Sequence, residues 1–373
     1  MIQLILAICL FFGAGSAARA GAIDRLDNLD SSQRTSPLSQ IEWLYNIGTV
    51  KTTAGRRFSI LIVTTECPEF DGFIPGTLLP IVNGLAAPQI TVQVLDLDRK
   101  KQYAFSTTTD NFDPSTFSAI AEAGKVSVIR RNDGSAVRDL RTDSVVTDML
   151  ASGTTPDHHT FSLRLSAVST KSRAAFGTNG WVDNGTLGKA LYLSRTARIL
   201  DPRTAASLQI DGETFILASG AFWEDHQVVN FTTSSIGTNI RWNWFAAEFD
   251  DQSDMMMYQL ENGSTGEVIR NFAAHVLADG SVEEVSDLSI EAVSTVHSDG
   301  HSVPSAWRIT SPSLGLDLSA RHDVTAPWLK MQMGLVKGEM LEGPASTQGR
   351  ASFGAADFLW AEYFDSGFFG LGL

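Results

Sequence analysis

The sequence is short of cysteine, and this shortage excludes a disulfide-stapled fold. Only Cys9 and Cys67 occur in 373 residues. Cys9 lies in an apolar N-terminal segment that we expect to be cleaved off, so Cys67 has no partner for an intramolecular disulfide. We therefore expect the stability of the fold to come from a packed core.

Long apolar runs and an excess of positive charge are also missing. No uninterrupted apolar run reaches the roughly 20 residues that a membrane-spanning helix needs, so we expect no integral membrane segment. The formal net charge of −14 repels phosphate backbones, so nucleic acid is not an expected partner. With 43% hydrophobic and 19% charged residues, the chain has the composition of a folded protein, and its length favours two domains.

The N-terminal residues have the features of a secretory signal peptide. An apolar stretch from Leu4 to Phe12 precedes small residues and an A-x-A pattern that ends at Ala20. We expect cleavage of residues 1–20 and a secreted protein, or one of the secretory pathway, that functions as a monomer. Glycosylation is predicted at the asparagines of the N-x-S/T sequons Asn184, Asn230 and Asn262.

Short β-rich segments separated by turns dominate the rest of the chain. Asp211-Gly212 separates two such segments, and the acidic turn DDQSD separates residues 242–249 from 255–260. This pattern predicts an all-β chain of meandering antiparallel sheets. One helix is expected over residues 113–123, where an Asp N-cap and Pro114 precede a terminal glycine, and residues 66–88 are expected to form a long loop.

Familiar catalytic and metal-binding signatures are missing from the mature chain. It has no G-x-S-x-G, P-loop, dinucleotide-binding or H-E-x-x-H motif. His297 and His301 flank a turn, so their spacing does not place both rings on one helical face. We therefore predict no metal site and no cofactor.

Residues 242–249 carry an unusual concentration of indoles. In an extended strand, Trp242, Trp244 and Glu248 share one face. Across the hairpin, Met255, Met257 and Tyr258 offer an adaptable apolar surface. Two interpretations remain open: these residues form the wall of a site for a hydrophobic ligand, or an ordinary barrel core.

The segment GAFWEDHQ, residues 220–227, places charged residues inside a predicted strand. Alternation puts Phe222, Glu224 and His226 on one face, and Trp223, Asp225 and Gln227 on the other. Glu224 and His226 are then about 7 Å apart, and His226 is a candidate acid or base. The alternative is a polar junction between two sheets.

Three segments in order resemble the AttH-like, or hydroxyneurosporene-synthase-like, family. They are residues 42–65, beginning EWLY, residues 191–227, ending GAFWEDHQ, and residues 242–263, beginning WNWF. The family includes carotenoid hydratases, the secreted fungal kievitone hydratase and fungal Diels–Alderases. Its pattern differs here at Leu44, Glu224 and Asn243.

The resemblance implies two lipocalin-like antiparallel β-barrel or sandwich domains side by side, with an apolar pocket between or within them. We place the domains at residues 21–232 and 233–373, which makes GAFWEDHQ the last strand of the first. The implied partner is a hydrophobic small molecule.

Three functions from different classes follow. The first is a cofactor-independent cyclase of the Diels–Alderase type that folds a hydrophobic polyene from secondary metabolism. The second is a hydratase that adds water to an alkene of a prenylated or isoprenoid substrate, for which a carboxylic acid with a raised pKa is needed. The third is a secreted, non-catalytic carrier. The candidate catalytic residues are Tyr45, Glu224, Asp225 and His226, and the candidate walls are Trp43, Trp223, Trp242 and Trp244.

Overall fold

A computed structural model gives the fold of the chain. It describes residues 40–66, 89–108, 118–123, 146–155, 157–171, 174–178, 180–231, 239–298, 301–323, 329–333 and 336–366. The predicted signal peptide, residues 1–20, and almost all of the predicted loop at residues 66–88 lie outside these ranges.

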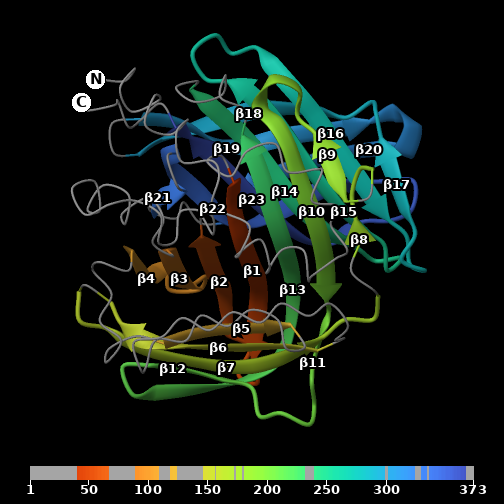
Figure 1. Ribbon diagram of the computed structural model, residues 1–373. Coiled ribbons are helices and arrows are strands. Elements are labelled where there is room, and N and C mark those ends of the chain that lie inside the picture. Colours follow the sequence, from red (N-terminus) through yellow and green to blue (C-terminus); the bar gives the residue numbers. More distant parts are fainter. Residues whose placement is uncertain are drawn as a thin grey trace, which may run out of the picture.

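Two antiparallel sheets contain nearly all of the described residues (Figure 1). The first has thirteen described strands, in the order β4-β3-β2-β1-β13-β12-β7-β6-β5, with β8–β11 beside this path. Its strands are β1 (Gln40–Thr52), β2 (Arg57–Glu66), β3 (Gln89–Asp96), β4 (Lys101–Thr108), β5 (Ser118–Ala123), β6 (Val146–Thr154), β7 (Thr160–Val168), β8 (Ala174–Ala175), β9 (Trp181–Asp183), β10 (Gly188–Ala197), β11 (Ile199–Leu200), β12 (Ser207–Ile210) and β13 (Glu213–Phe231).

The second sheet has ten described strands, in the order β17-β16-β15-β14-β23-β22-β20-β19-β18, with β21 beside β22. Its strands are β14 (Ile240–Phe249), β15 (Asp254–Asn262), β16 (Val268–Val276), β17 (Val282–Val285), β18 (Ser289–Ser298), β19 (His301–Ser311), β20 (Leu316–His322), β21 (Leu329–Met333), β22 (Val336–Arg350) and β23 (Ala356–Asp365). Short 3-10 helices occur at Gly185–Leu187 and Pro312–Leu314. The prediction of an all-β fold with two antiparallel units is confirmed.

Turn chemistry sets the hairpins, as the sequence predicts. Asp211 and Gly212 join β12 to β13 with φ angles of +50° and +82°, the left-handed values that a two-residue hairpin turn requires. The DDQSD turn joins β14 to β15, and Gln252 adopts a φ of +73° there. Both predicted hairpins are confirmed.

The helix predicted over residues 113–123 is wrong where the structure describes that segment. Residues 118–123 form strand β5, which pairs with β6 from Ser118 opposite Ser152 to Ala123 opposite Thr147. The N-cap and Pro114 are local signals, and tertiary pairing at the end of a sheet overrides helix propensity.

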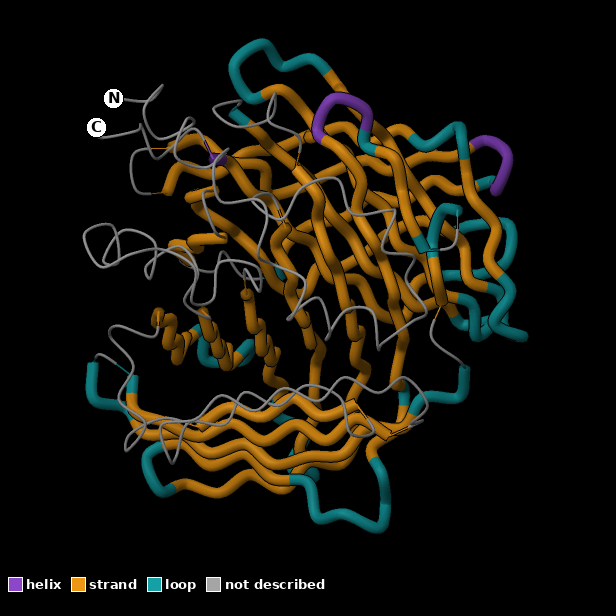
Figure 2. Tube along the Cα trace, in the orientation of Figure 1, coloured by secondary structure: helices purple, strands orange, loops and turns teal. Residues whose placement is uncertain are grey.

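The curled sheets, drawn as Cα traces in Figure 2, enclose and share three large apolar cores. One core lies inside the first sheet, where β6, β7 and β12 pack against β1–β4. Another lies inside the second sheet, where β14, β15 and β23 face β19, β20 and β22. The middle core joins the two sheets and takes side chains from β1, β2 and β10 on one side and from β14, β15, β16 and β23 on the other. The sequence alternation therefore gives each central strand two buried faces.

An ion-pair network also fastens the sheets together. Asp254, at the start of β15, accepts hydrogen bonds from Arg198 Nη2 at 2.5 Å and from Thr196 Oγ1 at 2.9 Å, and its carboxylate contacts Lys171 Nζ. Arg198 also donates to the backbone oxygens of Phe249 and Ser253. The tip of the β14–β15 hairpin is therefore anchored on the first sheet.

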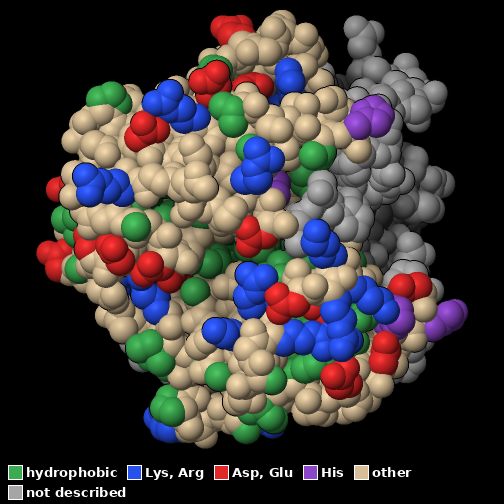
Figure 3. Space-filling model, turned by 180° about the vertical axis from the view of Figure 1, so that it is seen from behind, with side chains coloured by type: hydrophobic (Ala, Val, Ile, Leu, Met, Phe, Trp, Pro, Cys, Tyr) green, Lys and Arg blue, Asp and Glu red, His purple; other side chains and the backbone are tan. Residues whose placement is uncertain are grey.

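The surface carries charges of both signs. On the face drawn in Figure 3, Lys and Arg side chains lie among Asp and Glu side chains, and apolar side chains form only small separate patches. Within the part of the chain that the structure covers, no helix is long and apolar enough to cross a bilayer.

Candidate active site

Two rows of side chains face each other between the sheets. Direct cross-strand partners lie on the same face of a sheet and at the same level. On the first sheet, Asp225 on β13 is the cross-strand partner of both Ser194 on β10 and Tyr45 on β1. On the second sheet, Glu362 on β23 is the cross-strand partner of both Trp244 on β14 and Glu342 on β22.

The Tyr45 hydroxyl connects the two rows. It hydrogen-bonds to Glu342 Oε2 and lies 3.0 Å from Glu362 Oε2, and all three residues are buried. A hydroxyl has one proton and can donate it to only one carboxyl at a time. The second bond therefore requires a proton on the other carboxyl, which donates it to the tyrosine oxygen. The geometry favours a neutral carboxylic acid at this point.

Burial also favours the protonated form of these groups, because it raises their pKa values. Burial, with the neighbouring Glu362 carboxyl, raises the pKa of Glu342 well above its usual range. Burial also raises the pKa of Glu362 to about 7, against the lowering effect of the hydrogen bonds from Trp242 and Tyr45. The phenol of Tyr45 has its pKa raised by burial and by both carboxyls, so it stays protonated.

Glu342 has one weakly satisfied oxygen. Its Oε1 is buried and makes no hydrogen bond of normal geometry within the described chain, although a side-chain hydrogen bond with the Trp360 indole lowers the pKa of the carboxyl. A poorly satisfied buried polar atom is costly, and such atoms mark places where a ligand or water binds. Glu342 is thus the more buried acid of the pair and the one with a weakly satisfied oxygen.

Asp225 is a third buried carboxyl beside this pair. It accepts hydrogen bonds from Trp223 Nε1 at 2.7 Å, from Gln227 Nε2 at 2.8 Å and from the Ser194 hydroxyl. These donors are all neutral. Burial consequently outweighs them and raises the pKa of Asp225 to about 6.

Aromatic rings surround the carboxyls. Trp244 packs edge-on against Tyr45, with ring centroids 5.8 Å apart, and against Trp223, with centroids 6.2 Å apart. Trp242 stacks on Phe364 and donates its indole N–H to Glu362. Trp244 Nε1 is buried without a hydrogen-bond partner among the described residues. The three tryptophans therefore lie in one cluster, as the aromatic pattern predicts.

Tyr258 extends this cluster. It stacks on Tyr192 with centroids 5.6 Å apart, and its hydroxyl donates to Asn184 Oδ1 at 2.5 Å. Asn184 is buried, a position that leaves little room for a glycan in the folded chain. Asn262 is half-buried at the β15–β16 turn, and the Asn230 side chain lies outside the described set. Glycosylation at the sequons remains a prediction.

The predicted alternation along GAFWEDHQ is present in β13. Asp225 shares a face with Trp223 and Gln227, whereas Glu224 points to the opposite face. There the Glu224 carboxylate pairs with Arg195 Nη2 at 3.2 Å, and both side chains are buried. Glu224 is therefore part of an ion pair away from the acid cluster.

The two predicted methionines are also separated from the indoles. Met255 and Met257 are buried in the core inside the second sheet, and Met256 is the methionine that joins the cluster between the sheets. Since strand neighbours point to opposite faces, Tyr258 lies with Trp244 and Met257 does not.

Trp43 and His226 lie on strands that the structure describes, but their side chains are outside the described set. Trp43 pairs with Gln227, and Leu44 pairs with His226. Roles for these two side chains remain predictions.

Glu342 and Glu362 were missed by the sequence reasoning. One signal was present: Glu362 is the single charged residue in FLWAEYF, residues 358–364, where a buried strand would otherwise be apolar. Glu342, in MLEGPAS, carries no comparable signal. No group of three or more His, Cys, Asp and Glu side chains in the described ranges is arranged to hold a metal ion.

Comparison with known families agrees with this architecture. The model of the family described as AttH-like matches residues 31–356. The chain belongs to the AttH-like family. A comparison with curated proteins gave no match.

Solved structures show the same fold at low identity. An AttH protein from Nitrosomonas europaea has a TM-score of 0.59 and 17% identity, with 90% of this chain and 96% of that chain covered. Kievitone hydratase from Nectria haematococca has a TM-score of 0.53 and 13% identity, with 89% and 90% covered. CghA, solved with Sch210972, has a TM-score of 0.49 and 9% identity, with 88% of each chain covered. At these identities the likeness to the AttH protein and to kievitone hydratase establishes the fold alone.

Proposed function

We propose that this member of the AttH-like family is a hydratase that adds water to an alkene of a neutral, hydrophobic small molecule. The observation that carries the proposal is the buried Tyr45–Glu342–Glu362 group, in which Glu342 Oε1 makes no hydrogen bond of normal geometry within the described chain. Protonating an alkene needs a positioned acid that still carries its proton at neutral pH, and a buried carboxyl with a raised pKa among aromatic rings meets that need.

The reaction balances with groups at this site. The Glu342 carboxyl gives its proton to one alkene carbon, and the π electrons form the new C–H bond. Water then bonds to the cationic carbon and loses a proton to the Glu362 carboxylate, which has passed its own proton on to Glu342 through Tyr45. Because Tyr45 bonds to both glutamates, its hydroxyl can pass a proton between Glu362 and Glu342 and so restore the acid. The product is an alcohol.

The aromatic rings would stabilise the positive charge that develops on carbon. The faces of Trp and Tyr rings attract cations, most strongly where water is excluded. Trp244 packs against both Trp223 and Tyr45 beside the carboxyls. Asp225, with a pKa of about 6, is a second candidate base for the proton that water releases.

A ring-closing catalyst of the Diels–Alderase type is the second candidate. One observation favours it: the buried indole N–H of Trp244 lacks an acceptor among the described residues and would polarise a substrate carbonyl. This reaction needs a folded substrate and a neutral donor, and no proton transfer.

The test compares Glu342→Gln with Trp244→Phe on neutral prenylated phenols and on linear polyenes in heavy-oxygen water. For a hydratase, we expect labelled alcohol from the wild type and a rate at least about 100-fold lower in Glu342→Gln, since an amide cannot protonate carbon. For a cyclase, we expect an unlabelled isomer, a large loss in Trp244→Phe and a small one in Glu342→Gln.

The third hypothesis, a non-catalytic carrier, predicts binding without conversion. Substrate that is bound by both variants and recovered unchanged from the wild type would contradict both catalytic proposals.

A further inference from the structure

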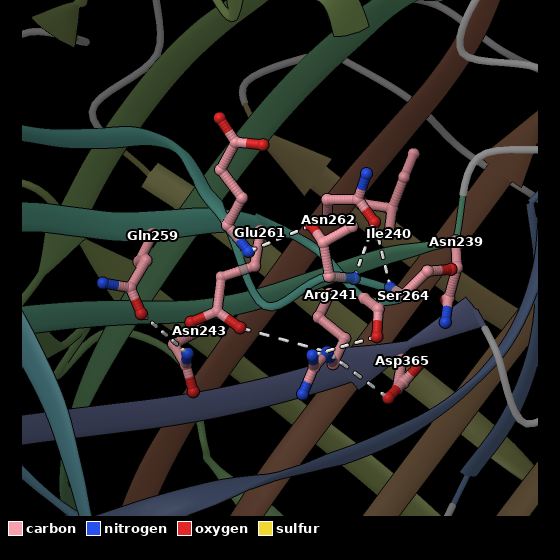
Figure 4. A network of polar contacts seen from close by, with 12 residues as sticks. Asn239, Ile240, Arg241, Asn243, Gln259, Glu261, Asn262, Ser264 and Asp365 are labelled. Carbon is pink, nitrogen blue, oxygen red and sulfur yellow. Dashed lines mark hydrogen bonds and ion pairs between the residues drawn. The ribbon is translucent and has the colours of Figure 1, made fainter.

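The core inside the second sheet contains polar side chains, and three of them form a connected chain of hydrogen bonds. Trp307 Nε1 donates to Asn243 Oδ1 at 2.9 Å. Asn243 Nδ2 donates to Gln259 Oε1 at 3.4 Å (Figure 4), and Gln259 Nε2 donates to the backbone oxygen of Ile290 at 3.1 Å. These three side chains thus follow the rule that buried polar groups are hydrogen-bonded.

Ser305 and His322 depart from this rule. In the register that pairs Ala306 with Arg321, they are the next positions along β19 and β20, and both are buried. Neither Ser305 Oγ nor either ring nitrogen of His322 makes a hydrogen bond of normal geometry within the described chain. The carbonyl oxygen of Pro344 accepts the Asp323 N–H at 3.1 Å and also interacts with the His322 ring, so the remaining ring nitrogen and Ser305 Oγ are the atoms without a partner in the described chain.

No atom of the described chain fills the side-chain position of Gly343, which lies on the strand that pairs with the one carrying His322. Gly343 on β22 is buried, yet a Cβ added there would meet no heavy atom of the described chain within 4 Å. Position 343 shares its face with Leu341 and Ala345, which belong to the core inside the second sheet, and Ala345 is the cross-strand partner of His322. The space is therefore on the same side of the sheet as the imidazole.

Aromatic rings lie beside this space. The ring of Trp307 packs edge-on to His322 with centroids 5.1 Å apart, and Phe245 packs edge-on to Trp307 at 5.3 Å. Phe245 also lies in the cross-strand row that runs through Ala361 to Gly343. Ala345 and Ala361, with the rings of Phe245 and Trp307, thus belong to the same core as the open position.

We propose that the space bounded by Gly343, Ser305, His322 and Trp307 is a second binding site, for a small neutral molecule that carries one hydroxyl on an apolar body. It is distinct from the acid cluster because Glu342 and Gly343 are strand neighbours, so their side positions point to opposite faces of β22. The second site therefore does not depend on the function proposed for the first.

The hydrogen-bonding groups of His322 and Ser305 indicate which class of ligand would bind. Burial lowers the pKa of His322 to about 4, so the ring is neutral at pH 7 and has one N–H donor and one acceptor nitrogen. A hydroxyl group complements that pair, because it both donates and accepts. An ionic ligand would lose its hydration and gain only a neutral imidazole and a hydroxyl in return.

The test uses ¹⁹F NMR with two probes of similar shape, 4-fluorophenol and 4-fluorotoluene. We expect the wild-type chain to bind both, and Gly343→Val to bind neither. His322→Leu should lower the affinity for 4-fluorophenol about tenfold, the equivalent of one hydrogen bond. The affinity for 4-fluorotoluene should stay unchanged. Glu342→Gln should leave both affinities unchanged, since its side chain is on the other face of β22.

Folding of each variant is checked by thermal melting. If Gly343→Val does not fold, Gly343→Ala adds a smaller side chain at the same position and should lower the affinity for both probes. The proposal is overturned if Gly343→Val binds the probes as the wild type does. It is also overturned if neither probe binds at millimolar concentration and a crystal structure shows only an ordered water between Ser305 and His322.

Discussion

The hydroxyl of Tyr45 on β1 and the carboxyl of Glu342 on β22 are 297 positions apart in the sequence and hydrogen-bond across the two sheets. The same hydroxyl reaches Glu362 at 3.0 Å. One phenol of the first sheet thus holds two acids of the second, so the acid cluster exists only while the sheets are packed together.

Tyr45→Phe should destabilise the chain. The substitution leaves buried carboxyl oxygens of Glu342 and Glu362 without their donor, and an unsatisfied buried polar group costs about 1–3 kcal/mol. Urea denaturation followed by circular dichroism gives the free energy of unfolding. Tyr363→Phe is the matched control, because its hydroxyl makes a longer hydrogen bond, 3.3 Å, to Asp365. An equal loss in both variants would contradict the special role of Tyr45.

Asp225→Asn should change how stability depends on pH. Burial raises the folded pKa of Asp225 from 3.8 to about 6, so the folded state binds this proton more tightly than the unfolded state. The stabilisation is complete below about pH 4 and is lost as the pH rises toward 6, by about 3 kcal/mol. The wild type should therefore lose stability over this window relative to Asp225→Asn.

The control for this measurement is Asp98→Asn. Hydrogen bonds from Arg57 lower the pKa of Asp98, so the carboxylate contributes stability that is present above its unfolded pKa and is lost at lower pH. The two variants should shift the pH profile in opposite directions. A wild-type profile parallel to that of Asp225→Asn between pH 4 and 6 would contradict the prediction.

Asp254→Asn should weaken the attachment between the sheets. The change removes the negative charge that Arg198 and Lys171 share, and it leaves buried cations poorly compensated. Breaking a buried ion pair on one side typically costs about 3–5 kcal/mol. Differential scanning calorimetry of this variant is compared with Asp317→Asn, which breaks the exposed pair with Arg308 and should lower the melting temperature much less.

Gly48→Ala should distort the first sheet beside the acid cluster. A Cβ at Gly48 would overlap the Phe222 ring and stand 2.5 Å from the Ala221 oxygen. Such overpacking typically costs about 1–3 kcal/mol. Gly343→Ala, where the Cβ has open space, is the control and should change the melting temperature little. An unchanged melting temperature in Gly48→Ala would show that Phe222 can move aside.

Local patterns were enough to predict the fold class and part of the site. Alternation separates Asp225 from Glu224, and the Asp211-Gly212 turn fixes the hairpin that leads into β13. The indoles of Trp242 and Trp244 share a face for the same reason. Each of these conclusions depends on residues close together in the sequence.

The partners of these residues could not be predicted in the same way. Glu342 reaches Tyr45 only because two separate sheets pack face to face, and no spacing along the chain encodes that contact. Met255 and Met257 were placed with the indoles because the hairpin is correct, yet their alternation sends them to the opposite core. The strand at residues 118–123 likewise depends on β6 and not on its own caps.

The long strand β13 presents adjacent carboxylates to two different surroundings. A single-residue deletion between the Asp211-Gly212 turn and Glu224 would shift both carboxylates by one position. Because side chains alternate with a period of two, Glu224 and Asp225 would then exchange faces of the sheet. The carboxylate now neutralised by Arg195 would enter the aromatic layer, and the present acid would meet a guanidinium. The register of one strand, together with residue identity, thus determines which carboxylate lies in the aromatic layer and which pairs with Arg195.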